Sequence, residues 1–156
     1  MEIKTLTKKE LSDYSNLAKK IILNTNYYTE HAKREESEKF SEESLEKKIK
    51  DRNNLFVFAE EDKKLIAFFN GQYDSGTFWA NWLGVDPTYR NKGITEKILF
   101  YVNCELERNN VHKVWFDTLV NNKEAVGLVK KLGFKKIGRL NNHWHNQDFY
   151  LWEKEL

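Results

Sequence analysis

The stretch from Val85 to Thr95 holds the residue types best suited to binding an anion. It lies between an apolar run, Phe78–Val85, and a segment whose apolar residues have helical spacing. It therefore predicts a strand, a turn and the first turn of a helix, where free N–H groups and the helix dipole favour negative charge. Arg90 and Lys92 add two cations, and Gly93 allows close approach of the backbone to a ligand. These features predict a phosphate-binding cradle.

From these residues alone, the alternative to a phosphate-binding cradle is a tight turn whose basic side chains are simply solvated. The segment Arg90–Thr95, however, resembles the pyrophosphate loop Arg/Gln-x-x-Gly-x-Gly/Ala of the GNAT superfamily of acyl-CoA-dependent N-acyltransferases. The preceding Asp86–Tyr89 also resembles the usual lead-in to that loop. Thr95 departs from the pattern, because the family mostly has Gly or Ala there.

A second signature follows at the expected distance. Residues Asn122 to Phe134 are similar to the family pattern Asn-x-x-Ala-x-x-Leu-Tyr-x-x-Leu-Gly-Phe. The departure is Val129, which stands where many members have the Tyr that protonates the departing CoA thiolate. A CoA thiol ionises at a pKa of about 8–9, so the missing acid need not cost much activity. Two motifs in the correct order make the resemblance specific from about Phe56 to the C-terminus.

The resemblance implies a binding site for acetyl-CoA as cosubstrate. Asn122 is implied to bond the pantetheine arm, and the backbone amide of Val85 to bond the thioester carbonyl oxygen as an oxyanion-hole donor. The residues implied to bind the cosubstrate are Leu83, Val85, Arg90, Asn91, Lys92, Gly93, Ile94, Thr95, Asn122 and Ala125.

The base that generates an uncharged amine is harder to identify. Some relatives carry Glu or His on the central strand, where this chain has Trp79 and Asn81, and neither titrates. Asn81 could hold a water that relays the proton. Asp148, with His143 and His145, is a candidate on the last hairpin, which often reaches the acceptor pocket in the family. For each of these three, a local hydrogen bond in the turn is the alternative.

The remaining histidines and the cysteine give weaker signals. His143 and His145 could share one face of a strand near Asp148, but no further ligand is clustered with them, so we expect no metal. His31 and His112 have no neighbours in the sequence that suggest chemistry. Tyr27 and Tyr28 are candidate pocket walls, although packing explains them equally well. Cys104 lies off the apolar stripe of its helix with no adjacent His, which argues against an acyl-enzyme.

Bulk composition limits the class of protein. The 156 residues, 40% hydrophobic and 32% charged, predict one folded domain covering residues 1–156. The 26 basic and 24 acidic residues are interspersed, so no nucleic-acid tract is expected. No apolar run approaches the roughly 18 residues of a membrane span, and the N-terminus has no signal-peptide core. A single cysteine fits a reducing compartment, and we expect a cytoplasmic protein.

Hydrophobic periodicity predicts a mixed α/β chain in the order β-α-α-β-β-β-α-β-α-β-β, which is also the order of the resembling family. The expected fold is a GNAT-type, mainly antiparallel sheet, flanked by helices and splayed at the central strand beside Val85. On that strand Trp79, Asn81, Leu83 and Val85 are expected to share one face. The other expected strands are Glu2–Thr5, Leu55–Glu60, Leu65–Tyr73, Val114–Val120, Lys135–Leu140 and Phe149–Glu153. The expected helices follow Thr7, Ser41 and Gly93 and cover Lys123–Leu132.

The resemblance implies an N-acetyltransferase that moves the acetyl group of acetyl-CoA to a primary amine by direct attack. An acyl-CoA-binding module with little or no catalysis is the alternative, favoured by Val129. A third alternative is that the loop Arg90–Thr95 binds the phosphate of another nucleotide. No acidic residue follows it at the spacing at which a dinucleotide fold binds the ribose, which argues against this alternative. The acceptor stays open among small amines, amino acids, antibiotics, polyamines and proteins. By analogy, the hairpin with Trp144 and Trp152 offers apolar area for a homodimer.

Overall fold

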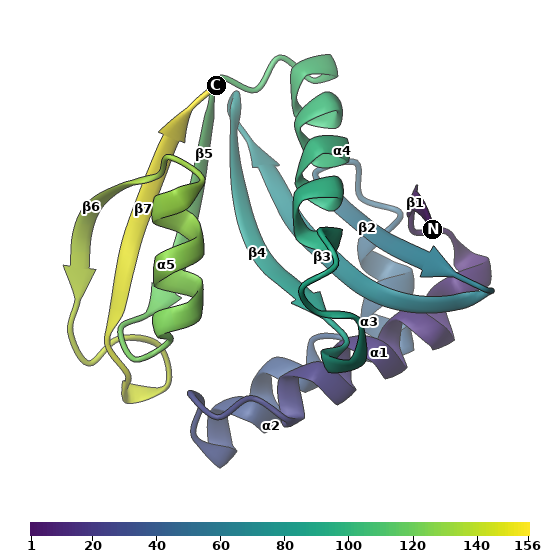
Figure 1. Cartoon of the computed structure of the whole chain (residues 1–156), viewed down its shortest axis with the longest axis horizontal. Helices are drawn as coiled ribbons and strands as arrows, with labels where there is room; N and C mark the ends of the chain where they lie inside the picture. Colours follow the sequence, from purple (N-terminus) through teal and green to yellow (C-terminus); the bar gives the residue numbers. More distant parts are fainter.

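The apolar runs pair into one seven-stranded sheet in the computed structural model, which describes all of residues 1–156 (Figure 1). The strands are β1 (Glu2–Thr5), β2 (Asn54–Glu61), β3 (Lys64–Asp74), β4 (Thr77–Val85), β5 (Lys113–Leu119), β6 (Lys135–Leu140) and β7 (Phe149–Glu155). The helices are α1 (Leu11–Leu23), α2 (Glu30–Glu38), α3 (Glu42–Lys48), α4 (Ile94–Arg108) and α5 (Lys123–Lys131). Three short 3-10 turns are η1 (Lys8–Glu10), η2 (Pro87–Tyr89) and η3 (Trp144–Asn146).

The sheet has the order β1-β2-β3-β4-β5-β7-β6. All neighbouring strands are antiparallel except β4 and β5, which run parallel. The expected mixed, mainly antiparallel sheet is therefore confirmed, and β4 is its middle strand. No helix of the chain is both long and apolar enough to cross a membrane.

Helices cover both faces of the sheet (Figure 1). On one face, the apolar stripe of α4 packs on β2, β3 and β4, as its spacing predicts, and α5 lies beside it over β5. The buried residues of the α4 stripe are Ile94, Ile98, Val102 and Leu106. On the other face, α1 and α3 pack on the aromatic side chains of Phe56, Phe58 and Phe68. The buried hydroxyl of Tyr14 donates to the Phe69 carbonyl oxygen at 2.9 Å, so this core leaves that polar group satisfied.

The sheet opens between β4 and β5. Their ladder has four residue pairs, from Thr77–Lys113 to Ala80–Phe116, although β4 continues to Val85. Residues Asn81–Val85 therefore have no strand partner on the β5 side. Figure 1 shows the two strands diverging along their length. This is the splay expected at the central strand, and it leaves backbone polar groups available to a ligand.

A β-bulge on β4 corrects one expectation. The register with β3 shifts between Asn70, which pairs with Trp82, and Gly71, which pairs with Ala80, so Asn81 has no partner there. The bulge breaks the strict alternation of side chains. Leu83 and Val85 consequently pack on the α4 side with Phe78 and Ala80, while Trp82 packs against the α1 side. The expected shared face of Trp79, Asn81, Leu83 and Val85 is therefore wrong.

Helix α2 was not expected from the residue pattern, which indicated two helices between the first two strands where the structure has three. Thr29 begins α2 by accepting a hydrogen bond from the Ala32 amide. Only one apolar residue of the helix, Ala32, is buried, and the other buried residues are Glu36 and Ser37. Hydrophobic periodicity could not reveal α2, because polar contacts hold it against the fold.

The surface proposed for self-association is also smaller than expected. Trp152 is 1% exposed, and its indole N–H donates to the Thr118 hydroxyl at 2.9 Å. Only Trp144 of that pair is exposed, at 41%. The hairpin therefore does not offer the apolar area that the sequence suggested.

Candidate active site

The lead-in to the predicted cradle is anchored by the buried side chain of Asp86. Its Oδ1 accepts hydrogen bonds from the Thr88 amide at 3.0 Å and the Thr88 hydroxyl at 2.8 Å. Its Oδ2 accepts a hydrogen bond from the Lys20 ammonium on α1 at 2.9 Å. The turn that presents the cradle is thereby fixed to the opposite layer of the fold.

This anchor predicts an acid-sensitive contribution to stability. The Lys20 ammonium holds the pKa of Asp86 at about 2, below the usual range. A lowered folded pKa means that the stabilisation is present above about pH 4 and is lost as the pH falls towards 2. We expect Lys20→Met to cost about 1–2 kcal/mol at pH 7, since one pKa unit corresponds to about 1.4 kcal/mol. Urea unfolding at pH 7 and pH 3 measures this cost.

Lys19→Met is the matched control, because Lys19 is the preceding residue on α1 and forms no ion pair. Its stability should stay near that of the unsubstituted protein at both pH values. The loss caused by Lys20→Met should shrink at pH 3. An equal loss at both pH values would contradict the assignment.

The cradle has the predicted geometry. Gly93 precedes α4 with φ of 70°, and no heavy atom lies within 4 Å of the position that a Cβ would take. A ligand can therefore reach the N–H groups of the first turn of α4. The Lys92 side chain lies over the Tyr89 ring, with its ammonium 4.9 Å from the ring centre. Of the two cations expected in the cradle, Arg90 alone lines the cavity described next.

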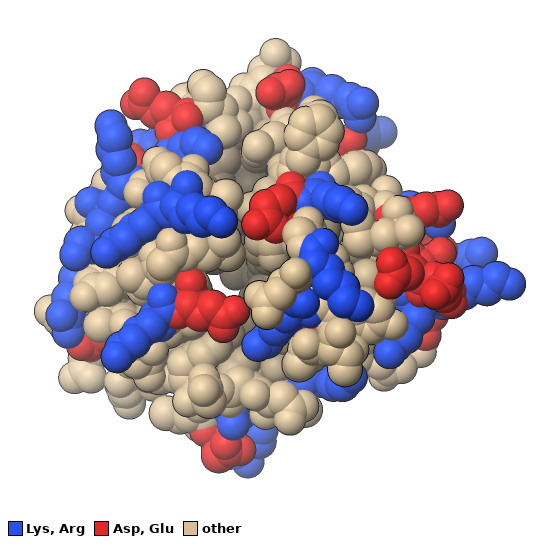
Figure 2. Space-filling model, in the orientation of Figure 1, with Lys and Arg blue, Asp and Glu red and all other residues tan.

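A cavity of about 1130 Å³ begins at the open edge of β4 and extends to the cradle and the N-terminus of α5. Figure 2 shows a hollow in this face, over the place where Figure 1 draws β4 apart from β5. Apart from Lys92, all the residues expected to bind the cosubstrate line this cavity: Leu83, Val85, Arg90, Asn91, Gly93, Ile94, Thr95, Asn122 and Ala125. Asn122 also caps α5, since its Oδ1 accepts from the Ala125 amide at 3.2 Å.

A second cavity of about 320 Å³ lies beside the first, and Trp82 lines both. Seven of its 16 lining residues are aromatic, and it contains the amide side chains of Asn70 and Asn81. The Oδ1 atom of Asn70 is buried without a hydrogen-bond partner. A buried acceptor of this kind is costly unless a donor reaches it, so a ligand N–H would stabilise it. The aromatic residues of the lining are Tyr28, Phe40, Phe56, Trp79, Trp82, Trp144 and Phe149.

Asp117 on β5 is the titratable residue of the second cavity that sequence reasoning missed. Burial raises the pKa of its carboxyl to about 7, and the negative charge of Glu36 adds to the effect. No hydrogen bond from a protein group offsets this rise. A carboxyl with a pKa near 7 is suited to accept a proton at neutral pH. The signal in the sequence was a lone acid within the apolar run Val114–Val120.

Glu36 on α2 connects three parts of the cavity wall. It accepts hydrogen bonds from the Lys39 ammonium at 2.5 Å, His145 Nε2 at 2.9 Å and the Trp82 indole N–H at 3.2 Å. Burial opposes the ionisation of Glu36, but these hydrogen bonds outweigh it and hold the pKa below its usual value. A permanent negative charge therefore lies near Asp117.

The other sequence candidates for proton transfer do not meet here. Asp148 is an exposed side chain that accepts from Arg139 at 2.7 Å and from the Asn142 amide at 2.8 Å, and it lines neither cavity. His143 lies beside the Trp144 ring. The structure brings only His145 of that group to the second cavity. The alternative interpretation of Asp148, local hydrogen bonds in a turn, describes its contacts.

The two tyrosines expected as pocket walls lie one in each cavity. Tyr27 lines the large cavity, and burial raises its hydroxyl pKa to about 12. Tyr28 lines the small one, with its ring 5.7 Å from the Trp82 ring. Val129, at the position of the family Tyr, is 3% exposed and belongs to the core. No hydroxyl replaces it on α5 at that position.

Comparison with known proteins agrees with this geometry. The model of the acetyltransferase (GNAT) family matches residues 22–134. An acetyltransferase of Pectobacterium atrosepticum is 25% identical over 96 residues, which are 62% of this chain and 68% of that protein. The PaiA N-acetyltransferase of Thermoplasma acidophilum, solved in complex with coenzyme A, superposes with a TM-score of 0.85 at 21% identity, covering 99% of this chain and 98% of that chain.

The ribosomal-protein-S18-alanine N-acetyltransferase of Escherichia coli superposes with a TM-score of 0.77 at 18% identity, covering 99% of this chain and 92% of that chain. At these identities the superpositions establish the fold. The Escherichia coli enzyme is named for its acceptor, the alanine of ribosomal protein S18, but a likeness at 18% identity does not transfer that acceptor to this chain.

Proposed function

The chain belongs to the acetyltransferase (GNAT) family, and from that premise we propose that it moves the acetyl group of acetyl-CoA to a primary amine by direct attack. One observation carries the proposal. The unpaired edge of β4 separates a large cavity that ends in an anion cradle from a small aromatic cavity that contains Asp117. A thioester and an amine can therefore meet at Trp82, with each substrate held on its own side.

Acetyl-CoA would occupy the large cavity. The pyrophosphate would bind the N–H groups at the start of α4 together with Arg90. The pantetheine amides would pair with the free edge of β4, and the Val85 amide would donate to the thioester oxygen as negative charge develops. The cavity lining and the open Cβ position of Gly93 support this placement.

The acceptor amine would enter the small cavity as an ammonium ion. Asp117 takes one proton from it, and the freed lone pair attacks the thioester carbon to give a tetrahedral oxyanion. The C–S bond then breaks and CoA leaves as a thiolate. The nitrogen gives its second proton to that thiolate through water, and Asp117 returns its own proton to solvent. Val129 cannot protonate the sulfur, but thiolates leave readily because thiols ionise at a pKa of about 8–9.

A panel of ligands tests the cosubstrate. We expect acetyl-CoA and CoA to raise the melting temperature, because a ligand at a hundredfold excess over its Kd adds about 2.7 kcal/mol. ATP and NAD at the same concentration should add much less, since they lack the pantetheine arm. Comparable shifts with ATP, NAD and CoA would indicate a loop for another nucleotide. No shift with either CoA species would contradict the proposal.

An acyl-CoA-binding module without catalysis is the second candidate, and the buried Val129 favours it. One measurement distinguishes a transferase from a binding module. A transferase releases free thiol steadily from acetyl-CoA when an amine is present, and a binding module releases none above the rate without enzyme. Small amines, polyamines, amino acids and peptides form the first panel, since each fits the chemistry of the small cavity. We also propose a reducing, cytoplasmic setting, supported by the unpaired Cys104.

A further inference from the structure

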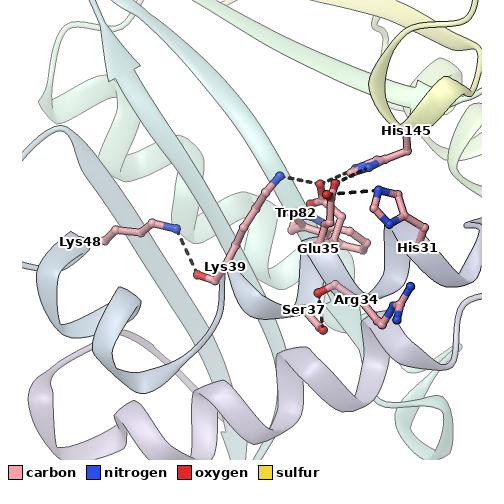
Figure 3. A network of polar contacts seen from close by, with 9 residues as sticks. His31, Arg34, Glu35, Ser37, Lys39, Lys48, Trp82 and His145 are labelled. Carbon is pink, nitrogen blue, oxygen red and sulfur yellow. Dashed lines mark hydrogen bonds and ion pairs between the residues drawn. The ribbon is translucent and has the colours of Figure 1, made fainter.

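His31, Glu35 and His145 place three metal-binding side chains together, at the rim of the small cavity. One donor atom from each lies within 4.8 Å of the other two. His31 and Glu35 are four residues apart on α2 and therefore share one face of that helix. His145 comes from η3, between β6 and β7, more than a hundred residues later in the chain. Figure 3 shows the two imidazoles converging on the Glu35 carboxylate.

The spacing of the donor atoms suits a small divalent cation. His31 Nε2 lies 3.2 Å from Glu35 Oε1, and His145 Nδ1 lies 3.0 Å from Glu35 Oε2. In a tetrahedral zinc site, bond lengths of about 2.0–2.2 Å place neighbouring donors about 3.4 Å apart. All three donor atoms lie within 4.8 Å of one another, so the widest separation must shorten for them to bind one ion.

The second nitrogen of His145 is already oriented as in a metal site. His145 Nε2 lies 2.9 Å from Glu36 Oε1, and the Glu36 side chain is 10% exposed and held by Lys39 and Trp82. Histidines that bind metals usually donate their other N–H to such a carboxylate. When Nε2 donates to Glu36, the lone pair of neutral Nδ1 faces the negative Glu35 carboxylate. A positive charge is needed between them, either a second proton on the ring or a metal ion.

We propose that His31, Glu35 and His145 bind one divalent transition-metal ion of the Zn²⁺ class. His31 supplies the third donor atom that a metal site needs, since its Nε2 already faces Glu35 Oε1 on the same helix. Two imidazoles and one carboxylate suit Zn²⁺, whereas Mg²⁺ and Ca²⁺ prefer all-oxygen ligands. His31 and Glu35 are 64% and 50% exposed, so solvent can supply a fourth ligand.

Such an ion would join α2 to the turn between β6 and β7. Both segments line the small cavity, through Glu36 on α2 and Lys39 just after it, and through Trp144 and His145 on the turn. The metal would therefore act as a structural clip on the acceptor side. The proposal rests on the side-chain cluster and holds whether or not the chain transfers acetyl groups.

Calorimetric titration of chelator-treated, tag-free protein tests the site. We expect ZnCl₂ to bind with a stoichiometry of one per chain and to raise the melting temperature, and MgCl₂ and CaCl₂ to do neither. His31→Ala should abolish the one-to-one binding of Zn²⁺, and the variant should fold because the His31 side chain is exposed. Glu36→Gln removes only the outer carboxylate and should weaken Zn²⁺ binding about 10–100-fold.

His143→Ala is the matched control, since His143 is two residues from His145 but lies outside the cluster. It should bind Zn²⁺ as the unsubstituted protein does. Absence of one-to-one Zn²⁺ binding would overturn the proposal. Equal weakening by His31→Ala and His143→Ala would overturn it as well, because binding would then not depend on the cluster. The calorimetric titration and the melting temperature are both measured without CoA, so neither result depends on catalysis.

Discussion

Asp117→Asn is expected to lower kcat for amine acetylation about 10²–10⁴-fold at pH 7, the usual contribution of a general base. The carboxyl lies in the acceptor cavity, and burial together with the Glu36 charge raises its pKa to about 7. Asn has the same shape and cannot accept the proton. Acetyl-CoA binding should be unchanged, because Asp117 does not line the larger cavity. Thiol release with a fixed amine, and the melting-temperature shift with CoA, measure the two effects.

The pH profile identifies the base more sharply than the rate alone. In the unsubstituted protein, kcat/KM should rise with pH through about 7 as Asp117 ionises, and Asp117→Asn should lack that rise. Asp148→Asn is the matched control. Its carboxyl pairs with Arg139 and lines neither cavity, so activity and profile should be retained. An equal loss in both variants would contradict the assignment to Asp117.

The same substitution has an opposite effect on stability. The folded pKa of Asp117 is raised above the unfolded value of about 3.9, so its ionisation opposes folding as the pH rises from about 4 through 7. Asp117→Asn removes this cost, which is at most about 4 kcal/mol at pH 8. We therefore expect the variant to unfold at higher urea concentration at pH 8 and to lose that advantage near pH 4. A stable but inactive variant separates catalysis from misfolding.

The local structure on the proposed cosubstrate side was predictable from sequence because its signals are local. The cradle is a strand, a turn and a helix start within Val85–Thr95, and each residue acts through its own backbone or side chain. The same is true of the α4 stripe and of the helix that follows Asn122. Short-range rules of spacing and capping determine these features, and the structure has them at the expected residues.

The acceptor side was not predictable because it depends on contacts between distant residues. The importance of Asp117 comes from burial beside Glu36, which lies on a helix that the apolar pattern does not reveal. His31 and Glu35 gain His145 as a third donor only when η3 folds back onto α2. The bulge at Asn81 requires the register of β3, which no property of β4 alone determines. In each case the deciding neighbour is far away in the chain.

The bulge itself gives the second large expected effect. A Cβ added at Gly71 would lie 2.3 Å from Cε1 of the Phe78 ring and 2.5 Å from the Trp79 carbonyl oxygen. The Phe78 ring is fully buried, and the carbonyl belongs to the backbone of the middle strand, so neither can move freely. We expect Gly71→Ala to destabilise the protein by about 1–3 kcal/mol or more, the usual cost of overpacking. Thermal unfolding should show a melting temperature lower by at least about 2–4 °C per kcal/mol.

Gly127→Ala is the matched control, since a Cβ there meets nothing within 4 Å and the residue lies within α5. It should stabilise the protein by about 0.4–1 kcal/mol, as Gly→Ala does in a helix. Gly71→Ala should also weaken catalysis beyond its effect on folding, because Gly71 sets the register that turns Trp82 and Asn81 into the small cavity. The acceptor KM should therefore rise while CoA affinity changes less. Unchanged stability in Gly71→Ala would show that β3 and β4 can separate there, and the bulge would then not define the cavity.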